Sequence, residues 1–227
     1  AVWESGPGCS TEDTVAKLRS TQAEAVEHRI AEADRQIGSE EMERRVASRL
    51  ATMVQRYPRK SGAGPAGGRY EHWAMFDDPR SQDTTTVART LARLASGRLP
   101  EEVRAALSCA TLRGIWKANK VEVRVLGCGG VIRRMVMRAV AAEYKEDIAE
   151  ALGDRQSGVA KDGAGRLHRR LVAYVNTAPE RVVLSMDMAD AFTTVSRDAL
   201  RKAALRHLPE MVPVVDSLYG APSKHWV

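Results

Sequence analysis

The stretch that decides the fold is Arg181-Val-Val-Leu-Ser-Met-Asp-Met-Ala-Asp-Ala-Phe-Thr-Thr-Val-Ser-Arg197. Its apolar run at 182–186 predicts a buried strand, and Asp187 stands directly after that run. Phe192 follows in a turn, and Ser196 then predicts the start of a helix because serine is a good N-cap residue. A carboxylate at the end of a buried strand suits a metal-dependent phosphoryl-transfer site.

The composition sets outer limits on fold and partner. With 44% hydrophobic residues in 227, the chain can bury a sizeable core. Aromatic residues make up only 5%, so aliphatic side chains and alanine must do most of the packing. Lysine and arginine total 35 against 29 acidic residues, a net charge of +6. This basic excess permits a nucleic-acid partner but does not require one.

The cysteines point to an intracellular chain, nuclear or cytoplasmic. Cys9, Cys109 and Cys128 are odd in number and widely spaced, which argues against a disulfide framework or a zinc site. No apolar run reaches about 18 residues, so no membrane span and no membrane partner are expected. The chain begins at Ala1 and closes on Trp226-Val227, and we expect it to be a piece of a longer protein.

Residues 1–58 predict a helical N-terminal arm. A first helix is expected at 12–36, and Ser39 predicts the N-cap of a second helix that Pro58 ends. The pair either packs on the main body as an amphipathic hairpin or acts as a separate arm, for instance in self-association. The Gly/Pro-rich stretch 59–69 predicts the domain boundary that follows.

The middle of the chain changes period. Helices are expected at 84–96 and 101–108, and residues 111–117 and 121–126 then alternate like the strands of a hairpin with a basic tip. A helix at 131–152 follows, with Gly153 as its C-terminal cap. From position 113 to 138 there are seven basic residues and one acidic residue. We interpret this window as a phosphate-contacting surface formed by Arg113, Lys120, Arg133, Arg134 and Arg138, although a solvated charged face is the alternative.

Two glycine-rich stretches do not make nucleotide loops. The stretch 127–130 lacks the third glycine of a dinucleotide-binding turn, because Ile132 stands in its place. The stretch 158–163 has the glycine spacing of a P-loop, but Ala164-Gly165 replaces the lysine and hydroxyl that would hold phosphate and magnesium.

From residue 60 onward, five segments in order resemble the reverse transcriptase domain of non-LTR retrotransposons. They are the Gly-Pro-x-Gly segment at 64–72, Lys117 followed by the Arg-rich stretch 124–134, the Gln-x-Gly stretch at 156–159 with Gly163, the stretch 187–197, and the helix at 208–220. The resemblance implies an α+β fold, namely polymerase right-hand fingers and a partial palm after the N-terminal arm. It assigns 59–180 to the fingers and 181–227 to the first palm strand and helix.

The resemblance also implies the site. RNA-directed DNA polymerases transfer a nucleotidyl group with two Mg²⁺ ions that stabilise the attacking and leaving oxygens. Asp187 would be the first magnesium ligand, with the backbone of Met188 as a second. The incoming dNTP would contact Lys117, Arg124, Asp190 and Phe192, the last lying under the sugar. An RNA template and a DNA primer are the expected partners.

The chain departs from the family pattern in ways that bear on activity. Val125 replaces the expected proline and Gly130 a glutamate. The family supplies its other two catalytic carboxylates from a later hairpin that does not appear before Val227. We therefore expect these residues alone to be inactive, with an exposed apolar face where the palm is incomplete. The alternative function is a non-enzymatic nucleic-acid-binding remnant that uses the basic hairpin.

Overall fold

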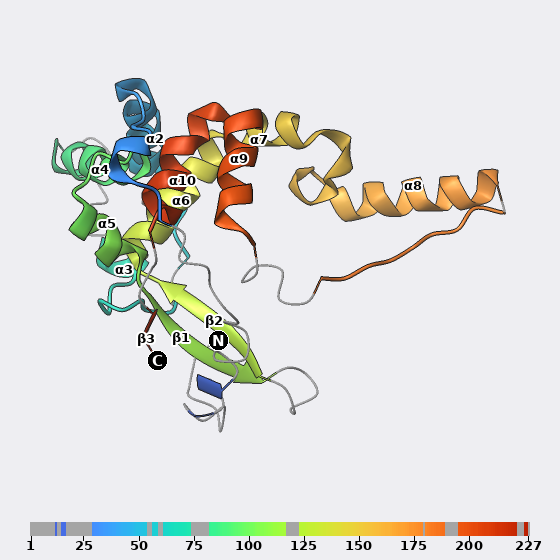
Figure 1. Ribbon diagram of the computed structural model, residues 1–227, viewed down its shortest axis with the longest axis horizontal. Helices are drawn as coiled ribbons and strands as arrows, with labels where there is room; N and C mark the ends of the chain where they lie inside the picture. The colour runs from blue at the N-terminus through green and yellow to red at the C-terminus, as the bar shows by residue number, and fades with distance from the viewer. Residues whose placement is uncertain are drawn as a thin grey trace. The chain divides into compact units, whose positions relative to one another are not determined.

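The computed structural model describes residues 12, 15–16, 29–53, 56–58, 61–73, 82–116, 123–178, 180–188, 195–221 and 225–226. Its contacts divide the chain into a main unit, Ala1–Glu143 with Val195–Val227, and a second unit, Tyr144–Thr194, inserted between those two parts. Helices and one small sheet are the regular elements of the described residues (Figure 1). The predicted α+β class is therefore confirmed, while the polymerase fold stays a prediction.

The helices predicted at 84–96 and 101–108 and the predicted hairpin are present, together with elements that were not predicted. The second unit contains α7 (Lys145–Leu152), η4 (Gly153–Arg155), η5 (Ser157–Val159) and α8 (Gly163–Thr177). The main unit contains η1 (Glu32–Asp34), α2 (Glu40–Met53), α3 (Tyr70–Trp73), α4 (Gln82–Ala95), α5 (Glu101–Ser108), β1 (Ala110–Trp116), β2 (Val123–Gly129), α6 (Val131–Glu143), α9 (Arg197–His207), η6 (Pro209–Met211), α10 (Val212–Tyr219) and β3 (His225–Trp226).

Helix α2 belongs to the body of the main unit. Ser39 Oγ accepts a hydrogen bond from the Met42 backbone N–H at 3.1 Å, which confirms the predicted N-cap. The helix packs against α4 and α6 and buries Val46 and Leu50 completely or nearly so. Of the two alternatives for the N-terminal arm, packing on the main body therefore holds for α2, and a separate arm does not. The first expected helix is wrong at its end, because residues 29–31 and 35–39 are not helical; most of it lies outside the described residues.

The core of the main unit lies among α2, α4, α6 and α10. Helix α4 contacts each of the other three and α2 contacts α6, and the side chains between them are mostly aliphatic or alanine, as the scarcity of aromatics predicts. Leu94, Val136, Val140 and Val212 are all fully buried. Close packing of this kind contributes most of the stability of a small domain.

A buried ion pair and its hydrogen bonds connect the N-terminal part of the main unit, near residue 35, with α9 and α10 in its C-terminal part. Asp216 is only 2% exposed, and its carboxylate accepts a hydrogen bond from Arg201 Nε at 2.7 Å. Its Oδ2 also accepts from the Gln36 backbone N–H at 3.0 Å, while Arg201 donates to the Asp34 carbonyl oxygen at 2.9 Å. The hydrogen bond to Asp216 raises the pKa of Arg201. Residues 34–36 are thereby fixed to α9 and α10.

The predicted helix at 131–152 is interrupted. Tyr144 breaks it between α6 and α7, which fall in different units. Gly153 ends α7 as predicted: its φ is +56°, and its N–H donates to the carbonyls of Ala149 and Glu150. A glycine suits this position because L side chains rarely adopt a positive φ.

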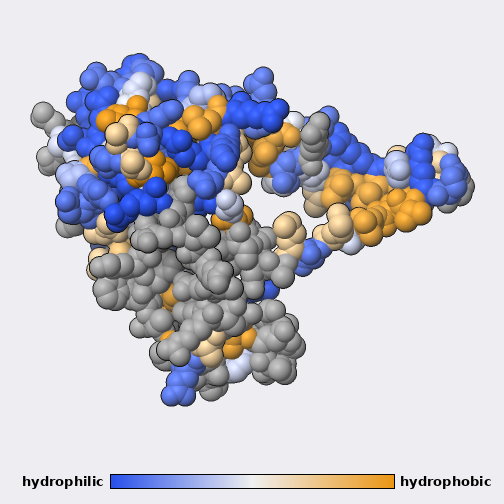
Figure 2. Space-filling model, viewed as in Figure 1, coloured by the Kyte–Doolittle hydropathy of each residue, from blue (hydrophilic) through white to orange (hydrophobic). Residues whose placement is uncertain are grey.

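In the second unit, α8 carries its charges and its apolar residues on different sides. Asp154 pairs with Arg170 at 3.3 Å, and Asp162 pairs with Arg169 at 2.9 Å. Gln156 Oε1 accepts a hydrogen bond from the Gly158 N–H at 2.9 Å, so this side chain caps the N-terminus of η5. Large apolar residues lie exposed on the other side, gathered into one patch (Figure 2). They are Leu167, Leu171, Val172, Tyr174 and Val175.

Candidate nucleic-acid interface

The strands β1 and β2 form the antiparallel hairpin that the alternating sequence predicts. In its register, Ile115 lies opposite Arg124 and Arg113 lies opposite Leu126. Because side chains alternate along a strand, these four residues share one face of the hairpin. Arg113 and Arg124 are diagonal neighbours across the two strands, a relation that separates residues by about 7–8 Å.

Both arginines are free to bind an anion. Each is exposed, and neither makes a hydrogen bond or ion pair with another residue in the described part of the chain. Two adjacent guanidinium groups without a carboxylate partner favour contact with a polyanion. Lys117 and Lys120, the predicted basic residues of the hairpin tip, lie outside the described residues.

The glycine-rich stretch packs closely against the base of the hairpin. A Cβ atom added at Gly64 would lie 2.6 Å from the Gly129 carbonyl oxygen and 2.7 Å from the Gly130 Cα. Only glycine permits so close an approach of two backbones. The predicted boundaries at 58/59 and 180/181 stay predictions, but residues 61–64 are buried or half-buried within the main unit.

Arg134 holds that stretch in place. It donates a hydrogen bond to the Gly62 carbonyl oxygen at 2.7 Å, and its guanidinium lies 5.0 Å from the ring centroid of Tyr70. The Tyr70 ring stacks on that of Tyr57 at 4.7 Å. Burial raises the pKa of Tyr57 to about 12, with a further increase from Tyr70 and an opposing effect from Arg138.

Arg133 also has protein partners. Its Nη1 donates to the Ser108 carbonyl oxygen at 2.9 Å, and its guanidinium lies 5.5 Å from the Tyr219 ring centroid. Arg138 is exposed on α6. Because Arg133 and Arg134 are engaged in packing, their contact with nucleic acid stays a prediction, and Arg113 and Arg124 are the better candidates.

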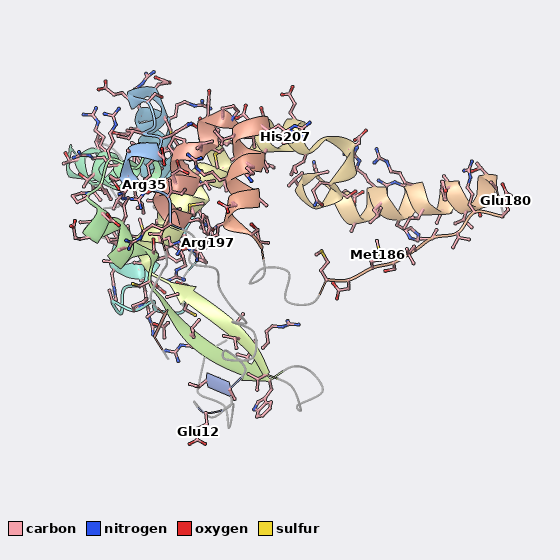
Figure 3. The ribbon with its side chains drawn as sticks, in the orientation of Figure 1. Glu12, Arg35, Glu180, Met186, Arg197 and His207 are labelled. Carbon is pink, nitrogen blue, oxygen red and sulfur yellow. The ribbon has the colours of Figure 1, made fainter. Side chains whose placement is uncertain are left out.

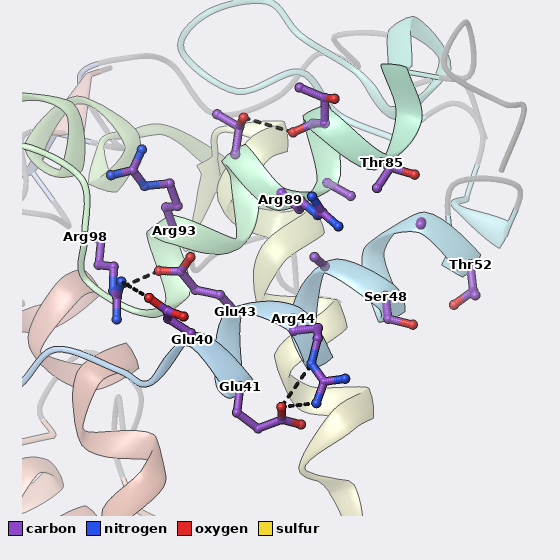
Figure 4. A pocket seen from close by; sticks show the side chains of 15 residues that line it. Glu40, Glu41, Glu43, Arg44, Ser48, Thr52, Thr85, Arg89, Arg93 and Arg98 are labelled. Atoms are coloured by element: carbon purple, nitrogen blue, oxygen red, sulfur yellow. Dashed lines mark hydrogen bonds and ion pairs between the residues drawn. The ribbon is translucent and has the colours of Figure 1, made fainter. Parts of the chain in front are cut away.

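A groove between α2 and α4 is a second place where basic residues gather (Figure 4). Its volume is about 1020 Å³. Arg98 pairs with Glu43 at 3.1 Å and with Glu40 at 3.8 Å, and Arg44 pairs with Glu41. Since three glutamates line the groove, it is less suited to a polyanion than the hairpin face.

The predicted strand before Asp187 is wrong. Residues 181–188 are not part of a strand and are all exposed, and Figure 1 draws them as a long, nearly straight trace after α8. A strand requires a neighbour for its backbone groups, and the described residues provide none here. Asp187 and Met188 are therefore at the surface, while Asp190 and Phe192 lie outside the described residues.

Asp187 and Met188, as the described residues place them, supply only part of the oxygen shell that a magnesium ion requires. Mg²⁺ requires an octahedral shell of oxygen ligands, commonly with one or two carboxylates and a substrate phosphate. The described part of the chain holds no group of three or more His, Cys, Asp or Glu residues that could bind a metal. Asp187 thus supplies a single exposed carboxylate, and magnesium binding stays a prediction.

The Asp216–Arg201 ion pair is absent from the sequence predictions. One signal points to it: Asp216 is the only charged residue within the apolar sequence of α10. A carboxylate in such a place must be paired, because burying an uncompensated charge costs several kcal/mol. The partner, fifteen residues earlier on α9, is not indicated by any spacing rule.

Comparisons with known proteins add no assignment. No protein-family model matches the chain, and no curated protein matches it. Within the described residues, no helix has both the length and the apolar character needed to cross a membrane.

Proposed function

We propose that this chain is the fingers and the opening of the palm of an RNA-directed DNA polymerase of the non-LTR retrotransposon type. These 227 residues by themselves bind nucleic acid and do not extend a primer. The observation that supports binding is the hairpin face, where Arg113 and Arg124 are adjacent, exposed and unpaired in the described part of the chain.

The chemistry of that face fits a phosphate backbone. An arginine presents a planar fork of donors that matches a phosphate group and keeps its charge at all physiological pH values. Phosphate contacts position a nucleic acid without reading its sequence, and they release counterions. Binding is therefore expected to be weakly sequence-dependent and to weaken steeply as salt is added.

The polymerase assignment adds specific roles to this general binding. Lys117 and Arg124 contact the triphosphate of the incoming dNTP, and the backbone near Asp190 faces the same phosphates. Phe192 lies under the sugar, and Asp187 with the Met188 carbonyl supplies part of the magnesium site. These roles rest on the family resemblance of the segments that carry them.

RNA binding tests the hairpin face. Arg113→Gln/Arg124→Gln removes two charges, and the matched control Lys202→Gln/Arg206→Gln removes two from the exposed side of α9. For single-stranded RNA, the hairpin variant should flatten the slope of log affinity against log salt by about 1.4, as expected for two lost phosphate contacts. The control should leave the slope unchanged. Equal effects of both variants would contradict a localised interface.

Nucleotide binding separates the polymerase from the simpler nucleic-acid-binding remnant. In the polymerase fragment, a fluorescent dNTP binds more tightly with Mg²⁺ present, and Arg124→Gln weakens this binding while Arg113→Gln does not. A remnant that only binds nucleic acid shows no such difference between the two variants. Primer extension by the 227-residue chain, abolished by Asp187→Ala, would show that the fragment is catalytically complete and would refute its predicted inactivity.

A further inference from the structure

Residues 181–188 expose a sequence that is complementary to itself. The exposed fractions are 84% at Val182, 76% at Leu184 and 82% at Met186, and Figure 3 shows Met186 on the trace that follows α8. Within the described part of the chain, residues 182–188 make no hydrogen bond to any other residue. Their backbone donors and acceptors are therefore free to pair with another strand.

The two faces of this segment differ in chemistry. In an extended chain, successive side chains point to opposite faces. Val182, Leu184, Met186 and Met188 therefore share an apolar face. The opposite face carries the segment's two charges, Arg181 and Asp187, with Val183 and Ser185 between them.

We infer that residues 181–188 pair antiparallel with the same residues of a second copy of this chain, with Leu184 on the two-fold axis. In this register each Arg181 lies opposite Asp187 of the other copy, and each Val182 lies opposite Met186. Two Arg181–Asp187 pairs thus lie on one face, and Val182, Leu184 and Met186 meet on the other. A two-fold interface is closed by construction, because each copy offers the same surface.

Other registers lose these matches. A slip of one residue places Val182 opposite Asp187, an apolar side chain against a charge. A slip of two residues in either direction leaves both Arg181 and Asp187 without their partners. Parallel pairing in register places Arg181 beside Arg181 and Asp187 beside Asp187, and like charges directly opposite destabilise a sheet. The sequence therefore favours the antiparallel arrangement about Leu184.

Contacts with α8 fix the side chain of Arg181 in one position before the two copies pair. Arg181 Nη1 donates to the Tyr174 carbonyl oxygen at 3.3 Å and to Thr177 Oγ1 at 3.1 Å, and its guanidinium lies 4.5 Å from the Tyr174 ring centroid. These contacts use Nη1 and leave Nε and Nη2 available for a carboxylate. They also hold the side chain in one place, which lowers the entropy lost on pairing.

The same helix supplies apolar surface for the paired strands. A two-stranded ribbon is marginally stable in water unless it packs against a helix or more strands. Leu167, Leu171, Tyr174 and Val175 lie exposed on α8, in the unit that carries the strand (Figure 2). In the dimer, the α8 apolar side of each copy covers the face formed by Val182, Leu184 and Met186.

Charge reversal tests the pairing, with sedimentation equilibrium as the readout. Asp187→Arg should raise the dimer Kd by about tenfold or more, because two attractive pairs become two repulsive ones. The swapped variant Arg181→Asp/Asp187→Arg should restore most of the affinity. The matched control Glu150→Arg reverses one exposed acidic charge on α7 of the same unit, and should leave the dimer unchanged.

Cysteine cross-linking tests the register. In a variant with Cys9, Cys109 and Cys128 changed to serine, Leu184→Cys should oxidise to a covalent dimer, because the two copies of residue 184 face each other within disulfide range. Met188→Cys should not, since its two copies lie at opposite ends of the ribbon. A chain that stays monomeric, a failed rescue by the swapped variant, or equal cross-linking at 184 and 188 would each overturn the inference. None of these readouts depends on nucleic-acid or nucleotide binding, so this test and that of the proposed function can fail separately.

Discussion

Helices α2 and α8 are similar amphipathic helices with opposite fates. Leu50 of α2 is 1% exposed because α4 and α6 cover its apolar side, whereas Leu167 of α8 is 47% exposed. The main unit closes over its apolar residues, while the second unit presents them at the surface. Amphipathic spacing thus predicts a helix and its apolar side, but it does not say whether this chain supplies the partner.

The largest expected effect comes from truncating one leucine in each helix, which tests whether α2 is buried and α8 is exposed. Leu50→Ala should lower the free energy of unfolding by about 3 kcal/mol, because it leaves a cavity in a closed core. Leu171→Ala should change it by less than about 0.5 kcal/mol, as expected for a residue on the surface of a monomer. Urea unfolding of dilute protein measures both changes.

Tryptophan fluorescence assigns these effects to a unit. Trp3, Trp73, Trp116 and Trp226 all belong to the main unit, and residues 144–194 contain no tryptophan. Fluorescence therefore follows the main unit, and far-UV circular dichroism follows the helices of both. A loss of stability for Leu171→Ala as large as that for Leu50→Ala would show that α8 is buried in the monomer.

A second comparison tests whether the glycine-rich stretch is as closely packed as the helices. Gly64→Ala should destabilise the main unit by about 2 kcal/mol, because the new Cβ would collide with the Gly129–Gly130 backbone. Gly130→Ala is the control, since, chain neighbours aside, no atom of the described residues lies within 4 Å of its added Cβ. Thermal unfolding of the two variants would give equal midpoints if residues 61–69 were a loose linker.

The smallest expected effect is the pH dependence of the stability that Glu143 contributes to the main unit. Glu143 accepts hydrogen bonds from Arg45 and Arg49 at 2.9 and 3.0 Å. Burial raises the pKa of Glu143, but these hydrogen bonds outweigh burial and hold the pKa below its ordinary value. Because the pKa is lower in the folded than in the unfolded chain, the stabilisation is present above the unfolded pKa and is lost as pH falls through the folded one.

Glu143→Gln measures that contribution. It should lower the stability of the main unit by about 1 kcal/mol near neutral pH, and the difference from the unchanged chain should shrink as pH falls and vanish once Glu143 is protonated in the folded chain. Glu102→Gln on α5 is a control of equal charge without an ion pair among the described residues. A pH-independent difference for Glu143→Gln would point to packing rather than to charge.

Local signals in the sequence predicted local structure well. Ser39 and Ser196 both accept the hydrogen bonds expected of N-cap residues, and Gly153 ends α7 with a positive φ. The alternation of apolar and polar residues correctly predicted the hairpin that β1 and β2 form. Each of these features depends on residues within a few positions of one another, or on a single short connection.

Predictions that needed a distant partner were less successful. The spacing of Arg133 and Arg134 did not indicate that the rings of Tyr219 and Tyr70 lie beside their guanidinium groups, and their contact with nucleic acid stays a prediction. The apolar run before Asp187 suggested a strand, and that strand has no neighbour in the described chain. Spacing rules show which side chains of a segment are apolar or charged. They do not show which residue, distant in the sequence, will contact those side chains.

The division of the main unit has a consequence for how the protein is made. Ser217 Oγ donates to the Leu94 carbonyl oxygen at 2.6 Å, and Asp216 fixes residues near position 36, so α10 completes a structure begun more than a hundred residues earlier. A ribosome adds about 5–20 residues per second, so synthesis of the inserted residues 144–194 alone delays α9 and α10 by roughly 3–10 s. During that interval the apolar side of α4 that α10 later covers is exposed in the nascent chain. A chaperone that binds apolar segments could bind α4 at this stage.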